Sequence, residues 1–363
     1  MFSPQISNEQ VELNAAGFFP INYTLVFSIL GLVTFTHSES TFRPFKSRCI
    51  WSVLAIFIDA SMVVYFVFKV LTLKIDLKVV YKGSQVLLVC FSGCYMVTTW
   101  ICSIVKREQF IEFLVKIIDF DVKLHTHSIT INYERSRRKI LYQLVGRLVY
   151  LFLMLALTLI FSFLLEATYT IVGRMSTCIL LIVNSATCHQ SIELISMVRA
   201  RFVILNKQIY NLAKSKQVTG KSTNRLVPLN HICALHHHLS KSITLFNSTF
   251  GLILLLMFGM SFVVIVSTIF YATIELQSSH TNWFILFYRT FSTLGFYVDP
   301  IYLCGVCYST IEEANRSGEL IHRIETEDHD VRDGIEMFSL QIANERVEFN
   351  AAGFFPVNYT LVF

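Results

Sequence analysis

The chain has 363 residues, of which 54% are hydrophobic and 15% charged, and its net charge is +5. The mean hydropathy is +0.56. So apolar a composition argues against a water-soluble globular protein and indicates a polytopic membrane protein. We find no paired carboxylates, nucleophile constellation or phosphate-binding loop, so we expect no enzyme and no cofactor.

The two ends of the chain repeat one another. Residues 1–27 and 337–363 are identical at 22 of 27 aligned positions. One repeat at this separation is a duplication and does not indicate a solenoid or propeller. Residues 15–36 are long enough to cross a membrane, and they lack the basic start of a secretory signal because the first Lys or Arg is Arg43. We treat 1–36 as a duplicate of the C-terminal segment.

Six stretches are long and apolar enough for helices that cross a bilayer, which takes about 20 residues. They are residues 50–71, 83–105, 148–170, 177–198, 245–274 and 283–307. A seventh helix is expected to begin at Ala351, but at about 1.5 Å per residue the segment to Phe363 covers only about 20 Å. The predicted fold is therefore all-α, a seven-helix membrane protein whose last helix is present only as its first half.

The basic residues of the connecting segments predict the orientation. Residues 37–49, 106–147, 199–244 and 309–350 lie on one side of the predicted spans and together hold 24 Lys and Arg, against five on the other side. Since cytoplasmic loops are rich in basic residues, we expect the N-terminus in the cytoplasm. This predicts six spans in 37–308 with long cytoplasmic loops 106–147 and 199–244, and then a cytoplasmic loop and half a helix in 309–363. The orientation is opposite to that of a G-protein-coupled receptor.

This layout resembles the insect gustatory receptor family. The stretch "HICALHHHLSKSITLFNSTFGLILLLMF" (231–258) looks like that family's entry into its fifth span, and "NAAGFFPVNYTLVF" (350–363) resembles the first half of its seventh. The family's Thr-Tyr and Gln-Phe ending would belong beyond Phe363. With the terminal repeat, this suggests that residues 1–36 are a neighbouring gene's last exon joined to this receptor, which we favour over an eighth span.

The resemblance implies a ligand-gated, non-selective cation channel in the plasma membrane, a homo- or hetero-tetramer that detects a tastant and is surrounded by membrane lipid. A bitter or plant-derived compound is favoured over a sugar. The seventh spans would surround the pore, and the start of that helix holds Phe354, Phe355, Asn358 and Tyr359. The alternatives are a secondary transporter, or a truncated receptor that carries no ligand-evoked current.

A ligand pocket is expected among the outer halves of the other spans. Small-molecule sites are mostly aromatic with a few polar groups, and ionisable residues inside a membrane mark pockets or internal pairs. The residues that fit are Tyr65, Tyr95, Glu166, Tyr169, Asn184, Tyr271, Trp283, Tyr288 and Arg289. Asp59, Glu193 and Asp299 are further ionisable residues in spans, and we expect Asp299 to satisfy backbone groups freed by Pro300.

Other clusters carry weaker signals. The histidines 231, 236, 237 and 238 with Cys233 could be taken for a metal site, but no carboxylate is near in sequence, so we expect none. The CGVC stretch (304–307) has redox spacing inside an apolar span, without the polar helix start that activates a thiol. The basic loop 106–147 also contains acidic residues and lacks interleaved aromatics, so nucleic acid is not a predicted partner.

Overall fold

The computed structural model describes residues 32, 35–38, 41–44, 46–72, 79–125, 133–164, 168–214, 223–277 and 282–361. The N-terminal copy of the repeat lies almost wholly outside these residues. The elements are β1 (Phe35–Ser38), β2 (Thr41–Pro44), α3 (Lys46–Thr72), α4 (Val79–Val105), α5 (Arg107–His125), α6 (Tyr133–Leu164), α7 (Thr168–Lys214), α8 (Thr223–Leu276), α9 (Trp283–Ile321), α10 (His329–Asn344) and η1 (Tyr359–Leu361).

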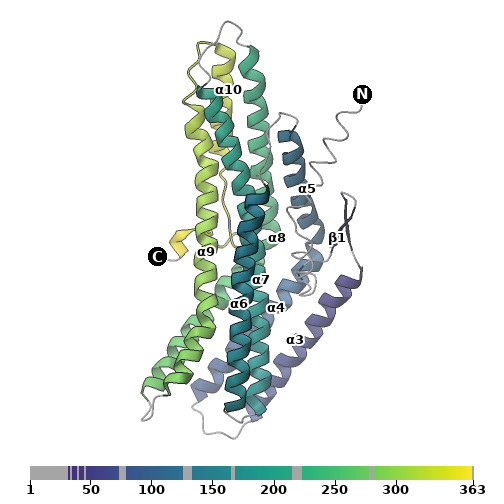
Figure 1. The fold of residues 1–363 in the computed structure, drawn as a ribbon, viewed down its shortest axis with the longest axis vertical. Coiled ribbons are helices and arrows are strands. Elements are labelled where there is room, and N and C mark those ends of the chain that lie inside the picture. The colour runs from purple at the N-terminus through teal and green to yellow at the C-terminus, as the bar shows by residue number, and fades with distance from the viewer. Residues whose placement is uncertain are drawn as a thin grey trace.

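The predicted all-α class is confirmed, with one small addition. Strands β1 and β2 form an antiparallel hairpin in which Phe35 pairs with Pro44 and Ser38 with Thr41. All the other long elements of the described residues are helices that run along one axis (Figure 1). The hairpin immediately precedes α3, the first helix of the bundle.

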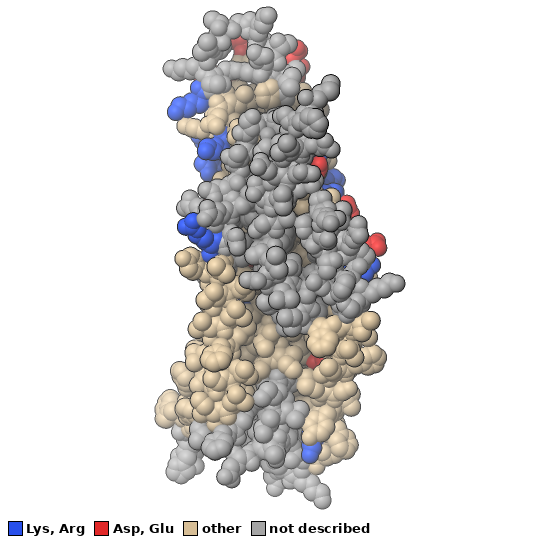
Figure 2. Space-filling model, turned by 45° about the vertical axis from the view of Figure 1, so that its right-hand side comes forward, with Lys and Arg blue, Asp and Glu red and all other residues tan. Residues whose placement is uncertain are grey.

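The bundle has an apolar half and a charged half. Helices α6, α7, α8 and α9 extend along much of its length, α3 and α4 flank its lower part, and α5 and α10 lie in its upper part (Figure 1). On the face drawn in Figure 2, most of the Lys, Arg, Asp and Glu atoms of described residues lie in the upper half, above a largely uncharged surface. This division is that of a protein half inside a bilayer and half in water.

Five described helices contain stretches long and apolar enough to cross a membrane. These are Cys49–Lys69, Gly83–Val105, Leu141–Ile160, Cys178–Lys214 and Pro228–Leu276, and each overlaps a predicted span. The sixth predicted span, 283–307, lies in α9 beside them (Figure 1). This span contains two ionisable residues, Arg289 and Asp299.

The segments predicted as long loops are mostly helical. Helix α5 and the start of α6 occupy much of 106–147, while α7 and α8 extend into 199–244. In α5 the buried residues Phe113, Ile117, Phe120 and Leu124 recur at helical spacing. The Phe113 ring packs against Phe246 of α8, with centroids 6.2 Å apart. Burial of this stripe explains why α5 continues outside the membrane.

A buried ion pair joins α5 to α7 in the charged half. The Arg201 Nε donates to Asp121 Oδ1 at 2.9 Å and its Nη2 to Asp121 Oδ2, while Nη1 donates to the Met197 carbonyl at 2.8 Å. A bidentate pair with an additional hydrogen bond is the geometry in which a buried guanidinium is stabilised. The pair fixes the register of the two helices beyond the membrane.

The region 309–350, predicted as a loop, is also largely helical. Helix α9 continues to Ile321, and α10 then folds back along it with Val331, Ile335 and Phe338 buried. The Asp328 side chain caps α10 by accepting a hydrogen bond from the Asp330 backbone N–H. The connection between the sixth and seventh predicted spans therefore contains helical structure, and the charge run 325–330 begins in the turn between α9 and α10 and ends in the first residues of α10.

Candidate functional site

A cavity of about 380 Å³ lies between α6, α7 and α9. Its volume is in the range of small-molecule sites. The lining residues are Gln143, Gly146, Arg147, Tyr150, Leu181, Asn184, Ser185, Leu294, Gly295, Val298, Asp299 and Tyr302. Leu294, Val298 and Tyr302 are 43%, 52% and 40% exposed, so the cavity opens at the side of the bundle between α6 and α9. This side belongs to the apolar half.

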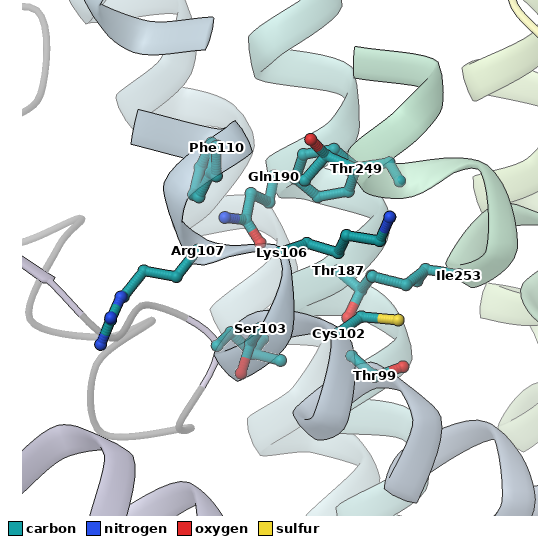
Figure 3. A pocket seen from close by; sticks show the side chains of 12 residues that line it. Thr99, Cys102, Ser103, Lys106, Arg107, Phe110, Thr187, Gln190, Thr249 and Ile253 are labelled. Atoms are coloured by element: carbon teal, nitrogen blue, oxygen red, sulfur yellow. The ribbon is translucent and has the colours of Figure 1, made fainter. Parts of the chain in front are cut away.

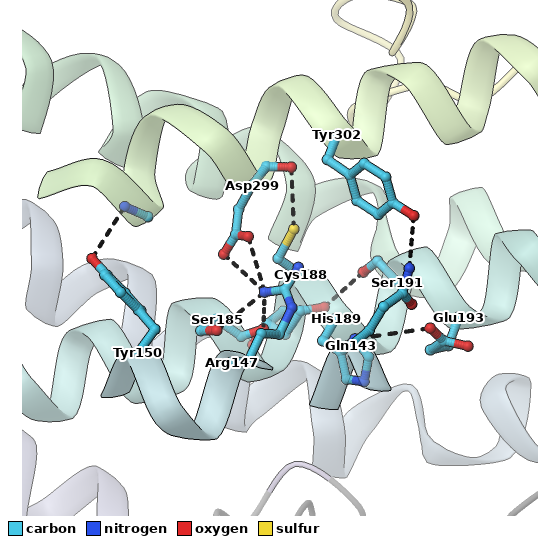
Figure 4. A network of polar contacts seen from close by, with 12 residues as sticks. Gln143, Arg147, Tyr150, Ser185, Cys188, His189, Ser191, Glu193, Asp299 and Tyr302 are labelled. Carbon is cyan, nitrogen blue, oxygen red and sulfur yellow. Dashed lines mark hydrogen bonds and ion pairs between the residues drawn. The ribbon is translucent and has the colours of Figure 1, made fainter. Parts of the chain in front are cut away.

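An ion pair between two lining residues, Arg147 and Asp299, lies in the wall of the cavity, and Figure 4 shows its contacts. The Arg147 Nη1 lies 2.9 Å from Asp299 Oδ1 and 3.0 Å from Oδ2. The same nitrogen donates to the carbonyl and the hydroxyl of Ser185, each at 3.1 Å. The Cys188 thiol donates to the Asp299 carbonyl at 3.5 Å. These contacts connect α6, α7 and α9 at one level and leave the pair without net charge.

Two tyrosines form further walls of the cavity. The Tyr150 hydroxyl donates to the Phe291 carbonyl at 3.2 Å and accepts from the Gly295 N–H at 3.3 Å. The Gln143 amide donates to the Tyr302 hydroxyl at 2.8 Å (Figure 4). Each hydroxyl therefore has a partner across the α6–α9 interface, which holds both rings in place.

Asn184, unlike the two tyrosines, has a polar atom without a hydrogen-bond partner among the described residues. Its residue is only 1% exposed and lines the cavity, yet its Oδ1 has no hydrogen-bond partner among the described residues. A buried acceptor without a partner costs about 1–3 kcal/mol. Asn184 is thus a predicted pocket residue that the structure places on the cavity wall, one position before the Ser185 that binds Arg147.

Three other predicted pocket residues take part in contacts between helices in the apolar half of the bundle. The Arg289 guanidinium lies over the Tyr271 ring, 4.5 Å from its centroid, and the Tyr271 hydroxyl is 2.8 Å from Ser84 Oγ. The Tyr288 hydroxyl is 3.0 Å from Thr158 Oγ1. The two groups join α4, α8, α6 and α9, but none of the three residues lines the cavity described above.

The remaining predicted pocket residues lie apart. Tyr65 and Trp283 are 46% and 69% exposed, and Tyr95 is fully buried with an unpartnered hydroxyl among the described residues. Glu166 lies outside the described residues, and the Tyr169 side chain is likewise not described.

The ionisable residues predicted within spans have different surroundings. Asp59 is 1% exposed, and neither carboxylate oxygen has a hydrogen-bond partner among the described residues. Glu193 lies 3.9 Å from His189 Nδ1 on the same helix. Asp299 forms an internal pair with Arg147, as expected of an ionisable residue in a span, and the alternative that its carboxylate serves the backbone near Pro300 was wrong. Arg147 falls in the predicted loop 106–147. The only sequence signal for its ion pair was the presence of an acidic residue, Asp299, in a distant predicted span.

The histidine cluster diverges in the structure. His236 Nε2 is 3.3 Å from the Ala314 carbonyl of α9, His237 Nδ1 is 2.8 Å from Glu345 after α10, and His238 Nε2 is 3.1 Å from Asp119 of α5. The three rings therefore bind three different elements, and they do not converge on one point. They fasten α8 to its neighbours in the charged half.

A second, much smaller cavity of about 20 Å³ lies where α4 meets α5, against α7 and α8 (Figure 3). It is about large enough for one water molecule. Lys106 and Arg107, at the junction of the two helices, extend in opposite directions from it (Figure 3). It offers no room for a ligand of the size that the larger cavity accepts.

The C-terminal segment after α10 is held against α8. The Asn247 amide donates to the Glu348 carbonyl at 2.7 Å, and its Oδ1 accepts from the Asn350 N–H at 3.2 Å. The Asn247 side chain therefore makes both a donor and an acceptor contact with the backbone of residues 348–350, as the backbone of a neighbouring β-strand would. Close approach is possible because Gly251 has no side chain, since a Cβ there would lie 2.8 Å from the Ala352 nitrogen.

The predicted start of the seventh helix lies in this segment. Phe354 and Phe355 belong to a turn in which the Phe354 N–H donates to the Ala351 carbonyl at 3.0 Å, and Ala352 has a positive φ of 53°. The first helical turn is η1, and Asn358 Oδ1 precedes it and accepts from the Thr360 N–H at 3.0 Å. Among the described residues after α10, the helical structure is the short 3-10 turn η1 (Tyr359–Leu361), and the Asn358 side chain caps it.

Tyr359 attaches η1 to α9. Its ring centroid lies 5.1 Å from that of Tyr308, and a Cβ on Gly305 would lie 2.7 Å from its hydroxyl. Gly305 is one helical turn beyond Tyr302, which lines the large cavity. The cavity and the C-terminal segment thus meet the same part of α9.

These features define a predominantly helical, multi-pass membrane protein with a side-opening cavity inside its apolar half. The sequence model of the 7tm chemosensory receptor family matches residues 26–363, and the chain belongs to this family. No curated protein matches it in sequence. The receptor family is not a family of enzymes.

Solved structures share the fold. The insect olfactory receptor OR5 from Machilis hrabei superposes with a TM-score of 0.70 at 10% identity, covering 94% of this chain and 92% of that one. The same receptor in complex with eugenol superposes with a TM-score of 0.62 at 12% identity and the same coverage. The predicted seven-span receptor layout is therefore confirmed at the level of the fold.

Proposed function

We propose that the protein is a gustatory receptor, a ligand-gated non-selective cation channel that binds a small molecule in the cavity between α6, α7 and α9. Its N-terminus lies in the cytoplasm, it resides in the plasma membrane, and four like or related subunits surround the pore. The ligand is a bitter or plant-derived compound and not a sugar.

The observation that carries the proposal is the cavity itself. Its volume of about 380 Å³, its apolar walls and its internally neutralised ion pair suit a small organic molecule. A receptor of the same fold has been solved with eugenol, a small molecule, bound to it. We also propose Tyr271, Tyr288 and Arg289 as residues of an outer entrance, since they cluster between helices near the outer ends.

The C-terminal segment supports the channel half of the proposal. Its residues 347–361 lie against α8 and α9, and Tyr359 reaches within one turn of the cavity wall. We therefore assign Phe354, Phe355, Asn358 and Tyr359 to the approach to a pore-lining helix, with helical structure starting at Tyr359. A ligand that moves α9 then moves this approach.

The experiment blocks the cavity without disturbing the fold. Gly146 lines the cavity, and a Cβ added to it would have no neighbouring atom within 4 Å, so the side chain of Gly146→Leu starts in open space beside the cavity. Gly83 is equally unhindered in α4 and is outside the cavity, so Gly83→Leu is the matched control. Both changes raise helix propensity by a similar amount.

The full chain is expressed in cultured cells, and whole-cell current and binding to the purified protein are measured with caffeine, denatonium, eugenol and sucrose. We expect at least one of the first three to bind and to evoke a cation current, with both responses lost in Gly146→Leu and kept in Gly83→Leu. Binding without current would refute the channel and leave a truncated receptor. Responses that survive Gly146→Leu would show that the cavity is not the site.

A further inference from the structure

We infer that the cavity between α6, α7 and α9 selects neutral, lipophilic molecules that carry a hydroxyl group, and that Asn184 is the residue that recognises this hydroxyl. The inference rests on the proposed function, because it specifies the ligand class of the same cavity.

The charge of the cavity excludes ions. Both carboxylate oxygens of Asp299 lie within 3.0 Å of Arg147 Nη1, so the pair is satisfied internally. A charged ligand would have to disrupt this pair or bring an uncompensated charge into an apolar region, and both are strongly unfavourable. A ligand without formal charge leaves the pair intact.

The walls favour a lipophilic molecule. Leu181, Leu294 and Val298 line the cavity together with the rings of Tyr150 and Tyr302. The mouth lies on the apolar half of the bundle, among side chains that are 40–52% exposed. A compound that partitions into the bilayer can therefore reach the cavity from the side, between α6 and α9.

Asn184 adds a requirement for a hydrogen-bond donor. Its Oδ1 is buried and unpartnered among the described residues, whereas the other polar groups of the walls bind one another across the helices. Once the Asn184 amide turns its oxygen toward the cavity, a ligand O–H satisfies this acceptor, while an ether or an acyl chain leaves it unsatisfied. Sites with a buried unpaired polar group discriminate strongly between such analogues.

The test compares 4-pentylphenol with 4-pentylanisole, two probes that differ by the methyl group which removes the O–H donor. Their dissociation constants are measured on the full chain in phosphatidylcholine nanodiscs. We expect the phenol to bind about tenfold more tightly than the ether, a difference of about 1.4 kcal/mol. Asn184→Leu, which keeps the side-chain size, should bring the ratio close to one.

The control removes another buried polar atom from the apolar half. Ser261 Oγ of α8 is also unpartnered among the described residues, but Ser261 does not line the cavity, so Ser261→Ala should keep the tenfold ratio. Should Asn184→Leu fail to reach the membrane, Asn184→Ala removes the same acceptor and must also abolish the preference.

Three outcomes would overturn the inference, and they separate it from the proposed function. Equal binding of both probes, abolished by Gly146→Leu, would keep the cavity as the site but refute the selection for a hydroxyl. If added phospholipid also abolishes the binding of both probes equally, acyl chains occupy the cavity. A preference that persists in Asn184→Leu would assign recognition to another group. If neither probe binds while caffeine or denatonium still gates the protein, the ligand class is wrong and the receptor function stands.

Discussion

The contact between Gly251 and the C-terminal segment predicts that Gly251→Ala releases this segment from α8. The new Cβ would lie 2.8 Å from the Ala352 nitrogen and 3.2 Å from its Cα, and both are backbone atoms that cannot rotate away. Overpacking of this kind costs about 1–3 kcal/mol. Helix α8 itself gains about 0.5–1 kcal/mol from losing a glycine, so the damage falls on the docked segment and not on the helix.

Amide hydrogen exchange measures this effect directly. The Val357 N–H donates to the Phe349 carbonyl at 2.7 Å and the Ala351 N–H to the Phe355 carbonyl at 3.0 Å, so both are protected while the segment is docked. A loss of about 1–3 kcal/mol raises their exchange roughly 5- to 150-fold. Gly83→Ala, with open space around the new Cβ, should leave them unchanged. Wild-type protection of these amides in Gly251→Ala would refute the reasoning.

Two further predictions concern stability, measured as thermal unfolding of the full chain in detergent. Arg147→Met leaves Asp299 buried without its partner and should destabilise by about 3–5 kcal/mol, while adding Asp299→Leu should recover much of the loss; strictly additive losses would contradict the pairing. Phe349→Ala should cost about 3–5 kcal/mol because the ring is fully buried against Phe246, whereas Phe354→Ala, at a position 77% exposed, should cost little, and equal effects would argue against the docked segment.

The sequence was a good guide to which segments lie in the membrane, and a poor guide to where helices end. The hydropathy of a segment reflects whether lipid or water surrounds it. The hydropathy therefore falls where α7 and α8 pass from the apolar half into the charged half. The backbone of both helices continues without a break, because packing in the charged half replaces the lipid. The stripe from Phe113 to Leu124 carried this information, since its spacing is helical and its apolar face needs a partner.

The site was harder to predict, because it depends on which helices are neighbours. Asn184 was selected for its depth in a span and does line the cavity. Arg147 and Asp299 are far apart in the sequence, and their pairing requires α6 and α9 to lie side by side at one register. A single sequence gives the depth of each residue but not the rotation of its helix. For the same reason Tyr65 and Trp283, which have suitable depths, are largely exposed.

A local turn interrupts the apolar C-terminal segment before the helical turn at Tyr359. The apolar run from Ala351 resembles the beginning of a span, but Gly353, with a φ of 78°, and Pro356 lie in a turn closed by the bridge between Asn350 and Pro356. The Asn-Tyr-Thr sequence at 358–360 contained the signal, because Asn is a preferred capping residue.

One turn of α9 has a thermodynamic consequence. Tyr302 borders the cavity. Three residues further on, the Tyr359 hydroxyl packs closely against Gly305, which has no side chain to obstruct it. Two equilibria that share a rigid element are linked, and linkage is reciprocal: whatever factor an occupant of the cavity applies to the docking of the C-terminal segment, docking applies to the affinity for the occupant. A substitution in η1, which does not contact the cavity, would then change the ligand concentration at which the protein responds.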